Sequence, residues 1–257
     1  MKRVNPETRA VNIVAGTRHR LVFLPTLCPS ARGRAARGKR PPFSAMRFQH
    51  IIWDWNGTLL DDTQAGVNAV NAMLGARSLP PLDLATYREV FCFPVKSFYR
   101  AVGFRMEEEN WDAMAREFHD RFLADATLRL HTHAARTLTA IQQAGIGQSV
   151  LSASEQTILE SMLAGYHVTR FFNNICGVDN LYGHSKLELG RLLLSRLNLP
   201  QDAVLMIGDS LHDHEVAADL GIPCLLIAQG HQSYARLANS GAPVLHSLAE
   251  VPAWMKA

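Results

Sequence analysis

An apolar segment near position 50 ends in a carboxylate followed by a turn. Phe48–Asp62 reads FQHIIWDWNGTLLDD, and Asp54 closes its apolar run just before Asn56-Gly57, a turn dipeptide that cannot continue a strand. In open parallel sheets the ligand crevice lies beyond the carboxyl ends of the strands. The segment therefore predicts a buried strand that presents Asp54 and Thr58 at a ligand site. The simpler alternative is a strand end with a turn-forming aspartate.

Strand-like and helix-like patterns alternate through the second half of the chain. Short apolar runs are separated by amphipathic helical patterns, and the runs are IGQSVLSAS, NNICGV, AVLMIGDS and PCLLIAQG. This alternation predicts an α/β fold with a doubly wound parallel sheet. Residues 63–130 contain only helix and loop patterns, including a long helix expected over 107–124. We therefore expect a core formed by 46–62 and 131–257, with 63–130 inserted as a helical cap.

The first 45 residues differ in charge from the rest. They carry ten of the 26 Lys and Arg residues but only one of the 23 acids, which leaves a body with 16 basic and 22 acidic residues. We expect residues 1–45 to be a disordered extension, and Met46 is a plausible true start. A targeting peptide and a nucleic-acid-binding arm are the alternatives. Because the body is acidic, no nucleic-acid partner is expected.

Compartment and cofactor classes are narrowed by two further features. No apolar run reaches the length of a membrane span, so no membrane association is expected. The cysteines form no C-x-x-C pair, which argues against a zinc site and a disulfide framework; they are Cys28, Cys92, Cys176 and Cys224. A cytoplasmic protein is expected. The sequence leaves monomer and homodimer equally open.

Polar side chains follow three of the predicted strands. Asp54 closes the first, Ser152 and Ala153 another, and Asp209 a third, with Asp213 one helical turn later. Carboxylates brought together from different strands repel one another unless a cation neutralises them. Mg²⁺ fits, because it prefers carboxylates, carbonyl oxygens, water and substrate phosphate. An aspartate held beside that ion can act as a nucleophile on phosphorus.

The order of these motifs resembles that of the haloacid dehalogenase superfamily. The similarity runs over about 47–244 and is strongest for the phosphoglycolate-phosphatase-like subgroup, with DWNGT, LSAS, Lys186 and IGDSLHDHEVAADLGI as the four motifs. The resemblance implies that Asp54 is the nucleophile in Mg²⁺-dependent hydrolysis of a small phosphorylated metabolite. It also implies phosphoryl-group ligands at Thr58, Ser152, Ala153 and Lys186, and metal ligands at Asp54, the Asn56 carbonyl, Asp209 and Asp213. Asp213 could instead orient metal-bound water or Lys186.

Asn56 departs from the family pattern. Phosphatases of this family usually carry an aspartate there, which serves as general acid and base, and an amide cannot transfer protons. Loss of such a group typically lowers the rate about 10²–10⁴-fold. Three outcomes stay open: a slow phosphatase, a dehalogenase or phosphonate hydrolase with another leaving group, or proton transfer by Glu155 or a cap histidine. A weakly active or silent phosphate-binding module is the alternative from a different class.

The cap offers one lysine for substrate recognition. Lys96 is the single lysine between residues 63 and 130. It lies near Phe93 and Tyr99, so it is a candidate for substrate binding together with Arg100. A solvated helix face with an aromatic core beneath it explains the same pattern equally well.

Overall fold

The computed structural model describes residues 48–182 and 186–256. The expectations for residues 1–45 and for a start at Met46 concern residues outside these ranges. Within the ranges, no helix combines the length and the apolar character needed to cross a bilayer.

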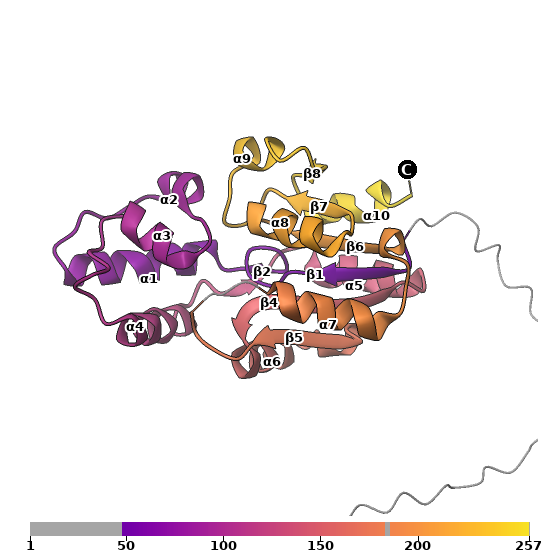
Figure 1. The fold of residues 1–257 in the computed structure, drawn as a ribbon, viewed down its shortest axis with the longest axis horizontal. Coiled ribbons are helices and arrows are strands. Elements are labelled where there is room, and N and C mark those ends of the chain that lie inside the picture. Colours follow the sequence, from indigo (N-terminus) through magenta and orange to yellow (C-terminus); the bar gives the residue numbers. More distant parts are fainter. Residues whose placement is uncertain (1–47, 183–185, 257) are drawn as a thin grey trace, which may run out of the picture. The chain divides into compact units, whose positions relative to one another are not determined.

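The core is a six-stranded parallel sheet (Figure 1). Its order is β5-β4-β1-β6-β7-β8, which places the first strand in the middle. The strands are β1 (His50–Trp53), β4 (Gly147–Glu155), β5 (Asn174–Val178), β6 (Val204–Gly208), β7 (Cys224–Ile227) and β8 (Val244–Leu245). The doubly wound α/β fold predicted from the sequence is confirmed.

Strand register sets the position of the polar residues. Trp53, the last residue of β1, pairs with Val150 on one side and Ile207 on the other. β1 and β6 therefore end nearly level, whereas β4 continues past them to Glu155. Asp54, Ser152 and Asp209 follow these paired residues by one or two positions, so their backbones are brought to one edge.

Helices cover both faces of β1, which explains its continuous apolar run. Ile51 and Trp53 belong to the hydrophobic cluster on one face, and Ile52 belongs to the cluster on the other. The helices of the core are α5 (Ala134–Gln143), α6 (Gln156–Gly165), α7 (Leu187–Leu197), α8 (Leu211–Leu220), α9 (Tyr234–Ala238) and α10 (Val251–Trp254). Three short 3₁₀ helices join them, at Thr169–Phe171, Gln201–Ala203 and Leu248–Glu250.

The strand β1 also carries a buried histidine. His50 is 4% exposed, and its Nε2 lies 2.8 Å from the Ser149 hydroxyl oxygen. Burial lowers the pKa of His50 from 6.5 to about 4. Between these pH values the unfolded chain binds a proton that the folded chain does not. The stability contributed by the neutral ring is therefore present above pH 6.5 and is lost as the pH falls to about 4.

We expect His50→Gln to remove this part of the acid sensitivity. Relative to the variant, the wild type should lose about 3 kcal/mol of unfolding free energy between pH 6.5 and 4. Urea unfolding of both proteins across that range measures the difference, in which the contributions of other titrating groups cancel. Parallel pH profiles for the two proteins would contradict the assignment.

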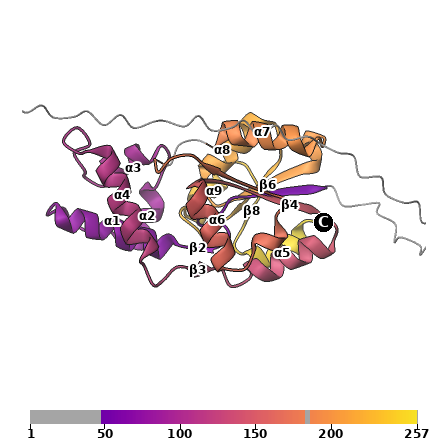
Figure 2. The same ribbon diagram turned by 90° about the horizontal axis from the view of Figure 1, so that it is seen from below.

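Four helices form the segment between the first and second core strands (Figures 1 and 2). They are α1 (Thr63–Ala76), α2 (Leu84–Val90), α3 (Val95–Ala101) and α4 (Trp111–Leu123). Their buried side chains make a separate hydrophobic cluster that includes Met73, Tyr87, Phe98 and Met114. We call this four-helix segment the cap.

The two chain crossings between core and cap pair with each other. β2 (Leu60–Asp61) runs antiparallel to β3 (Arg129–Leu130), and an ion pair of 2.6 Å joins Arg129 to Asp61. The expectation of only helix and loop over 63–130 is therefore wrong at β3. The predicted helix over 107–124 begins instead at Trp111, because the Asn110 side chain accepts a hydrogen bond from the Ala113 amide at 3.0 Å and caps the helix there.

Candidate active site

Asp54 lies at the carboxyl end of β1 and is held by a tight turn. Its amide donates to the Ile207 carbonyl at 2.8 Å, which extends the sheet by one bond. Gly57 has a φ of 73°. A Cβ at that position would stand 2.2 Å from an Asp209 carboxylate oxygen, so only glycine lets the chain pass there. The turn brings the Thr58 hydroxyl to 3.2 Å from Asp54 Oδ2 and 3.1 Å from Asp209 Oδ1.

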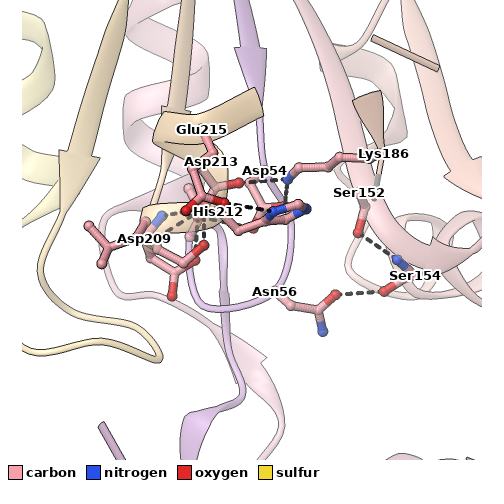
Figure 3. A network of polar contacts seen from close by, with 12 residues as sticks. Asp54, Asn56, Ser152, Ser154, Lys186, Asp209, His212, Asp213 and Glu215 are labelled. Carbon is pink, nitrogen blue, oxygen red and sulfur yellow. Dashed lines mark hydrogen bonds and ion pairs between the residues drawn. The ribbon is translucent and has the colours of Figure 1, made fainter. Parts of the chain in front are cut away.

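Lys186 joins two of the carboxylates (Figure 3). Its ammonium, 1% exposed, donates to Asp54 Oδ1 and, at 2.7 Å, to Asp213 Oδ1. Burial alone would lower the pKa of Lys186, but Asp213 and Asp54 more than offset it and raise the pKa above its usual range. The lysine is therefore a permanent positive charge beside Asp54.

Asp213 is fully engaged with hydrogen-bond donors. Its Oδ2 accepts from the Asp209 amide at 3.2 Å, the Ser210 amide at 3.0 Å and the Ser210 hydroxyl at 2.7 Å, while Oδ1 accepts from Lys186. Burial alone would raise the pKa of Asp213, but Lys186 and Ser210 hold it below the usual value. This arrangement suits the second sequence-based expectation, that Asp213 positions Lys186.

Three buried carboxylates form a potential cation site. Asp54, Asp209 and Asp213 each offer an oxygen within 4.8 Å of the others. Burial and the neighbouring acids raise the pKa of Asp54 to about 8 and that of Asp209 to about 6, against the opposing effects of Lys186 and His231. A divalent cation would offset the repulsion and lower both pKa values. Carboxylate oxygens are the donors that Mg²⁺ prefers, so the residues fit this ion.

Ser152 and Ala153 lie within β4, just beyond the residues that pair with β1 and before the strand ends at Glu155. The Ser152 side chain is 1% exposed, and its hydroxyl oxygen accepts from the Ser154 amide at 3.1 Å. Both residues line the same pocket as Asp54 and Lys186. The structure therefore brings together the phosphate-binding groups predicted at Thr58, Ser152, Ala153 and Lys186.

Asn56 is fixed through its side-chain amide. Its oxygen accepts from the Ser154 hydroxyl at 2.6 Å, and its Nδ2 donates to Asp62 Oδ2 at 2.6 Å. These two bonds fix the orientation of the amide, because only its nitrogen can donate to the Asp62 carboxylate. Asn56 lines the pocket, but its amide cannot act as a general acid or base.

Asp62 and His231 belong to the site although the sequence analysis did not single them out. Asp62, 1% exposed, accepts from Asn56, from the Gly57 amide at 2.8 Å and from His231 Nε2 at 3.2 Å. Burial alone would lower the pKa of His231, but Asp62 and Asp209 raise it to about 9. The histidine is therefore charged, and the two residues form a buried ion pair. His231 lies just beyond β7, so a search of every strand end would have found it.

Three other sequence candidates lie apart from these groups. Lys96 is exposed on α3, with its ammonium 4.8 Å from the centre of the Trp111 ring, and it is not among the residues that line the pocket. Arg100 is also exposed and pairs with Glu107 at 3.3 Å. Glu155 caps α6 by accepting from the Ile158 amide at 2.9 Å. The one histidine between residues 63 and 130, His119, does line the pocket.

A parallel sheet that carries a buried aspartate and a lysine in contact at its carboxyl edge places the protein in the class of α/β proteins with a charged ligand site at the strand ends. Within that class, the chain belongs to the haloacid dehalogenase-like hydrolase family, whose sequence model matches residues 51–227. The match confirms the predicted family and the prediction of an enzyme, a phosphatase of this family.

Characterised relatives span nearly the same region. The chain is 26% identical over 191 residues to the N-acetylmuramic acid 6-phosphate phosphatase of Pseudomonas aeruginosa, covering 72% of this chain and 84% of that protein. It is 25% identical over 214 residues to the phosphoglycolate phosphatase of Caulobacter vibrioides, covering 79% and 88%. A haloacid dehalogenase-like hydrolase from Streptococcus pneumoniae shares the fold, with a TM-score of 0.71, 20% identity, and coverage of 82% of this chain and 99% of that one.

Proposed function

We propose that the protein hydrolyses a small phosphate monoester in a Mg²⁺-dependent reaction, with Asp54 as the nucleophile. The observation that carries the proposal is the surroundings of Asp54: Lys186 and Thr58 contact its two oxygens, and the Asp209 carboxylate lies within the same 4.8 Å cluster. A carboxylate placed between fixed donors and a cation site can attack phosphorus. That attack breaks the ester P–O bond, releases the alcohol and leaves an aspartyl-phosphate, which water then hydrolyses to inorganic phosphate and free Asp54.

The proposed roles follow from these positions. Asp54 and Asp209, with the Asn56 carbonyl, would hold Mg²⁺, which supplies positive charge to the phosphoryl oxygens and keeps Asp54 ionised. Lys186, Thr58 and Ser152 would bind the phosphoryl oxygens and offset the charge that develops in the transition state. Asp213 holds Lys186 in place through a bond of 2.7 Å.

We assign proton transfer to Asp62 rather than to Asn56. The described residues that line the pocket include four carboxylates, Asp54, Asp62, Asp209 and Asp213. Three of them have other roles in this proposal, so Asp62 is the carboxylate left to accept a proton from the attacking water, and the cap histidine His119 is the alternative base among the lining residues. Its contact with Asn56 at 2.6 Å places it directly beside the family's usual acid–base position. Glu155 is less suitable because it caps a helix.

Metal dependence is the first test. The full-length protein should release inorganic phosphate from a panel of monoesters in the presence of Mg²⁺, lose this activity in EDTA and regain it when Mg²⁺ is added in excess. Asp209→Asn should weaken Mg²⁺ binding measured by calorimetry, because it removes one of the charged ligands. A folded protein that binds Mg²⁺ but releases phosphate from none of the esters would favour the silent binding module instead.

The geometry favours phosphate esters over the alternative substrates. Phosphonate cleavage in relatives uses a cap lysine that forms a Schiff base, and here Lys96 is exposed outside the lined pocket. Haloacid cleavage does not require the paired Lys186 and Asp213 that this site retains. The named substrates of the relatives, N-acetylmuramic acid 6-phosphate and phosphoglycolate, differ from each other, so the alcohol portion of the ester has to be inferred from this chain.

A further inference from the structure

A cavity walled largely by carbon atoms adjoins Asp54. Its volume is about 150 Å³, and it reaches from the carboxylates at the sheet edge to the cap. The walls on the cap side come from α3, α4 and the loop that follows α2. Apolar side chains dominate them, and these include Phe91, Phe93, Val95, Trp111 and Phe118, with Met162 of α6 opposite.

The cavity offers no spare positive charge to an anionic leaving group. Its described lining residues include no arginine, and its cations Lys186 and His231 are already paired with Asp54, Asp213 and Asp62. Burial lowers the pKa of the lining residue His119 below its usual value, so that ring is uncharged at neutral pH.

Two arginines beside the cavity donate to backbone carbonyls. Arg88 donates to the Gly230 carbonyl at 3.0 Å, and Arg236 donates to the Phe91 carbonyl at 2.9 Å. Neither is among the residues that line the cavity. A carboxylate on the alcohol portion of the substrate would lose its hydration in this cavity without gaining a cation among the lining residues, which is costly.

Hydroxyl groups at the cavity are directed at protein partners. The Tyr87 hydroxyl lies 3.0 Å from His231 Nδ1, and the Tyr182 hydroxyl donates to Asp112 at 2.6 Å. The His212 ring stacks on Phe93 with 4.5 Å between ring centroids, and its Nε2 is the one buried polar side-chain atom of the described lining residues that has no hydrogen-bond partner. A polyhydroxylated leaving group would find few partners on these walls.

We propose that the alcohol portion of the substrate is uncharged and apolar, with about the size of one aromatic ring. This inference rests on the proposed phosphatase function. The volume of about 150 Å³ includes the space beside Asp54 that the phosphoryl group would take, so what is left for the alcohol portion suits a group no larger than one ring. Ligand pockets commonly combine an apolar wall with a few polar groups that fix the reacting atoms, here the groups around Asp54.

Three esters of simple alcohols test the proposal: benzyl phosphate, methyl phosphate and 2-phosphoglycolate. With Mg²⁺ and the full-length protein, kcat/KM for benzyl phosphate should exceed both other values by about 100-fold, since even one buried methylene group can contribute about 10-fold or more. Equal values, or a preference for 2-phosphoglycolate, would overturn the inference but leave the phosphatase function intact. No phosphate release from any of the three would overturn both.

Two variants on α4 test whether the cavity wall causes the preference for benzyl phosphate over methyl phosphate. Phe118→Ala on α4 should lower the ratio of kcat/KM for benzyl over methyl phosphate about 10-fold or more, because it removes part of the wall. Leu123→Ala lies on the same helix, 43% exposed and outside the cavity lining, and should leave the ratio unchanged. If Phe118→Ala does not fold, Val95→Thr replaces a wall methyl with a hydroxyl of similar shape and should lower the ratio in the same direction. An unchanged ratio in the folded wall variant contradicts the proposal.

Discussion

Asp54→Asn is expected to abolish phosphate release, with a fall in kcat of at least about 10⁴-fold. The amide has no lone pair suited to attack on phosphorus, and it removes a charge from the predicted Mg²⁺ site. Folding should be unimpaired, because burial and, to a lesser extent, the neighbouring acids raise the pKa of Asp54 to about 8, and a neutral amide avoids the cost of a buried charge there. Lys186 keeps its other partner, Asp213, at 2.7 Å. Thermal unfolding without Mg²⁺ should thus show equal or higher stability.

A control and a direct readout sharpen this test. Asp61→Asn changes a carboxylate in the same segment, but Asp61 pairs with Arg129 and should not affect turnover. Rapid quenching of the wild type with a radiolabelled ester should trap protein-bound phosphate that hydroxylamine releases, as expected for an acyl phosphate. Labelled phosphate trapped equally on Asp54→Asn would show that another residue is the nucleophile.

Asp62→Asn should lower kcat by about 10² fold or more, because it removes the carboxylate to which we assign proton transfer. The exposed fraction of Asp62 is only 1%, and its contacts with Asn56 and His231 hold it at the site. The pH profile of kcat should change shape as well as height. A small loss with an unchanged profile would indicate a structural ion pair and no role in proton transfer.

Asn56→Asp alone does not restore the family's usual acid and base here. The new carboxylate would face Asp62 at the position where Asn56 Nδ2 now donates over 2.6 Å, and two like charges would repel. We expect this single variant to be less active than the wild type. The double variant Asn56→Asp with Asp62→Asn exchanges the two side chains and keeps one amide and one carboxylate, so it should recover activity to within about 10-fold of the wild type.

The four proteins of this cycle separate two hypotheses. If the wild type were a silent module for want of an acid and base, the double variant would far exceed it in kcat. If Asp62 already transfers protons, the wild type and the double variant should be comparable, and both single variants should be lower. Circular dichroism and Mg²⁺ binding by each variant control for loss of structure.

Local sequence patterns were enough for the parallel sheet and for much of its polar edge. Apolar runs that end in Asp54 and Asp209 identify two strand ends directly, and parallel strands bring such ends to one edge, whereas β4 continues past Ser152 to Glu155. The roles expected for Lys186 and Asp213 came from the resemblance, since nothing in their own segments indicates their partners. The prediction that a helix begins at residue 107 is wrong. The acidic run there is typical of a first helical turn, but the Asn110 side chain caps the helix, so it begins at Trp111.

Only the tertiary structure shows which residues contact Asn56 and which side chains line the cavity beside Asp54. In the sequence, Asp62 is one of two adjacent acids after an apolar run, and nothing marks it as a site residue. Its contacts with Asn56 and His231 depend on the turn around Gly57 and on the loop after β7. Phe118 reads as an ordinary core residue of an amphipathic helix. Periodicity reports that such a side chain is buried, but only the packing of the cap against the sheet edge determines whether it faces other side chains or a cavity.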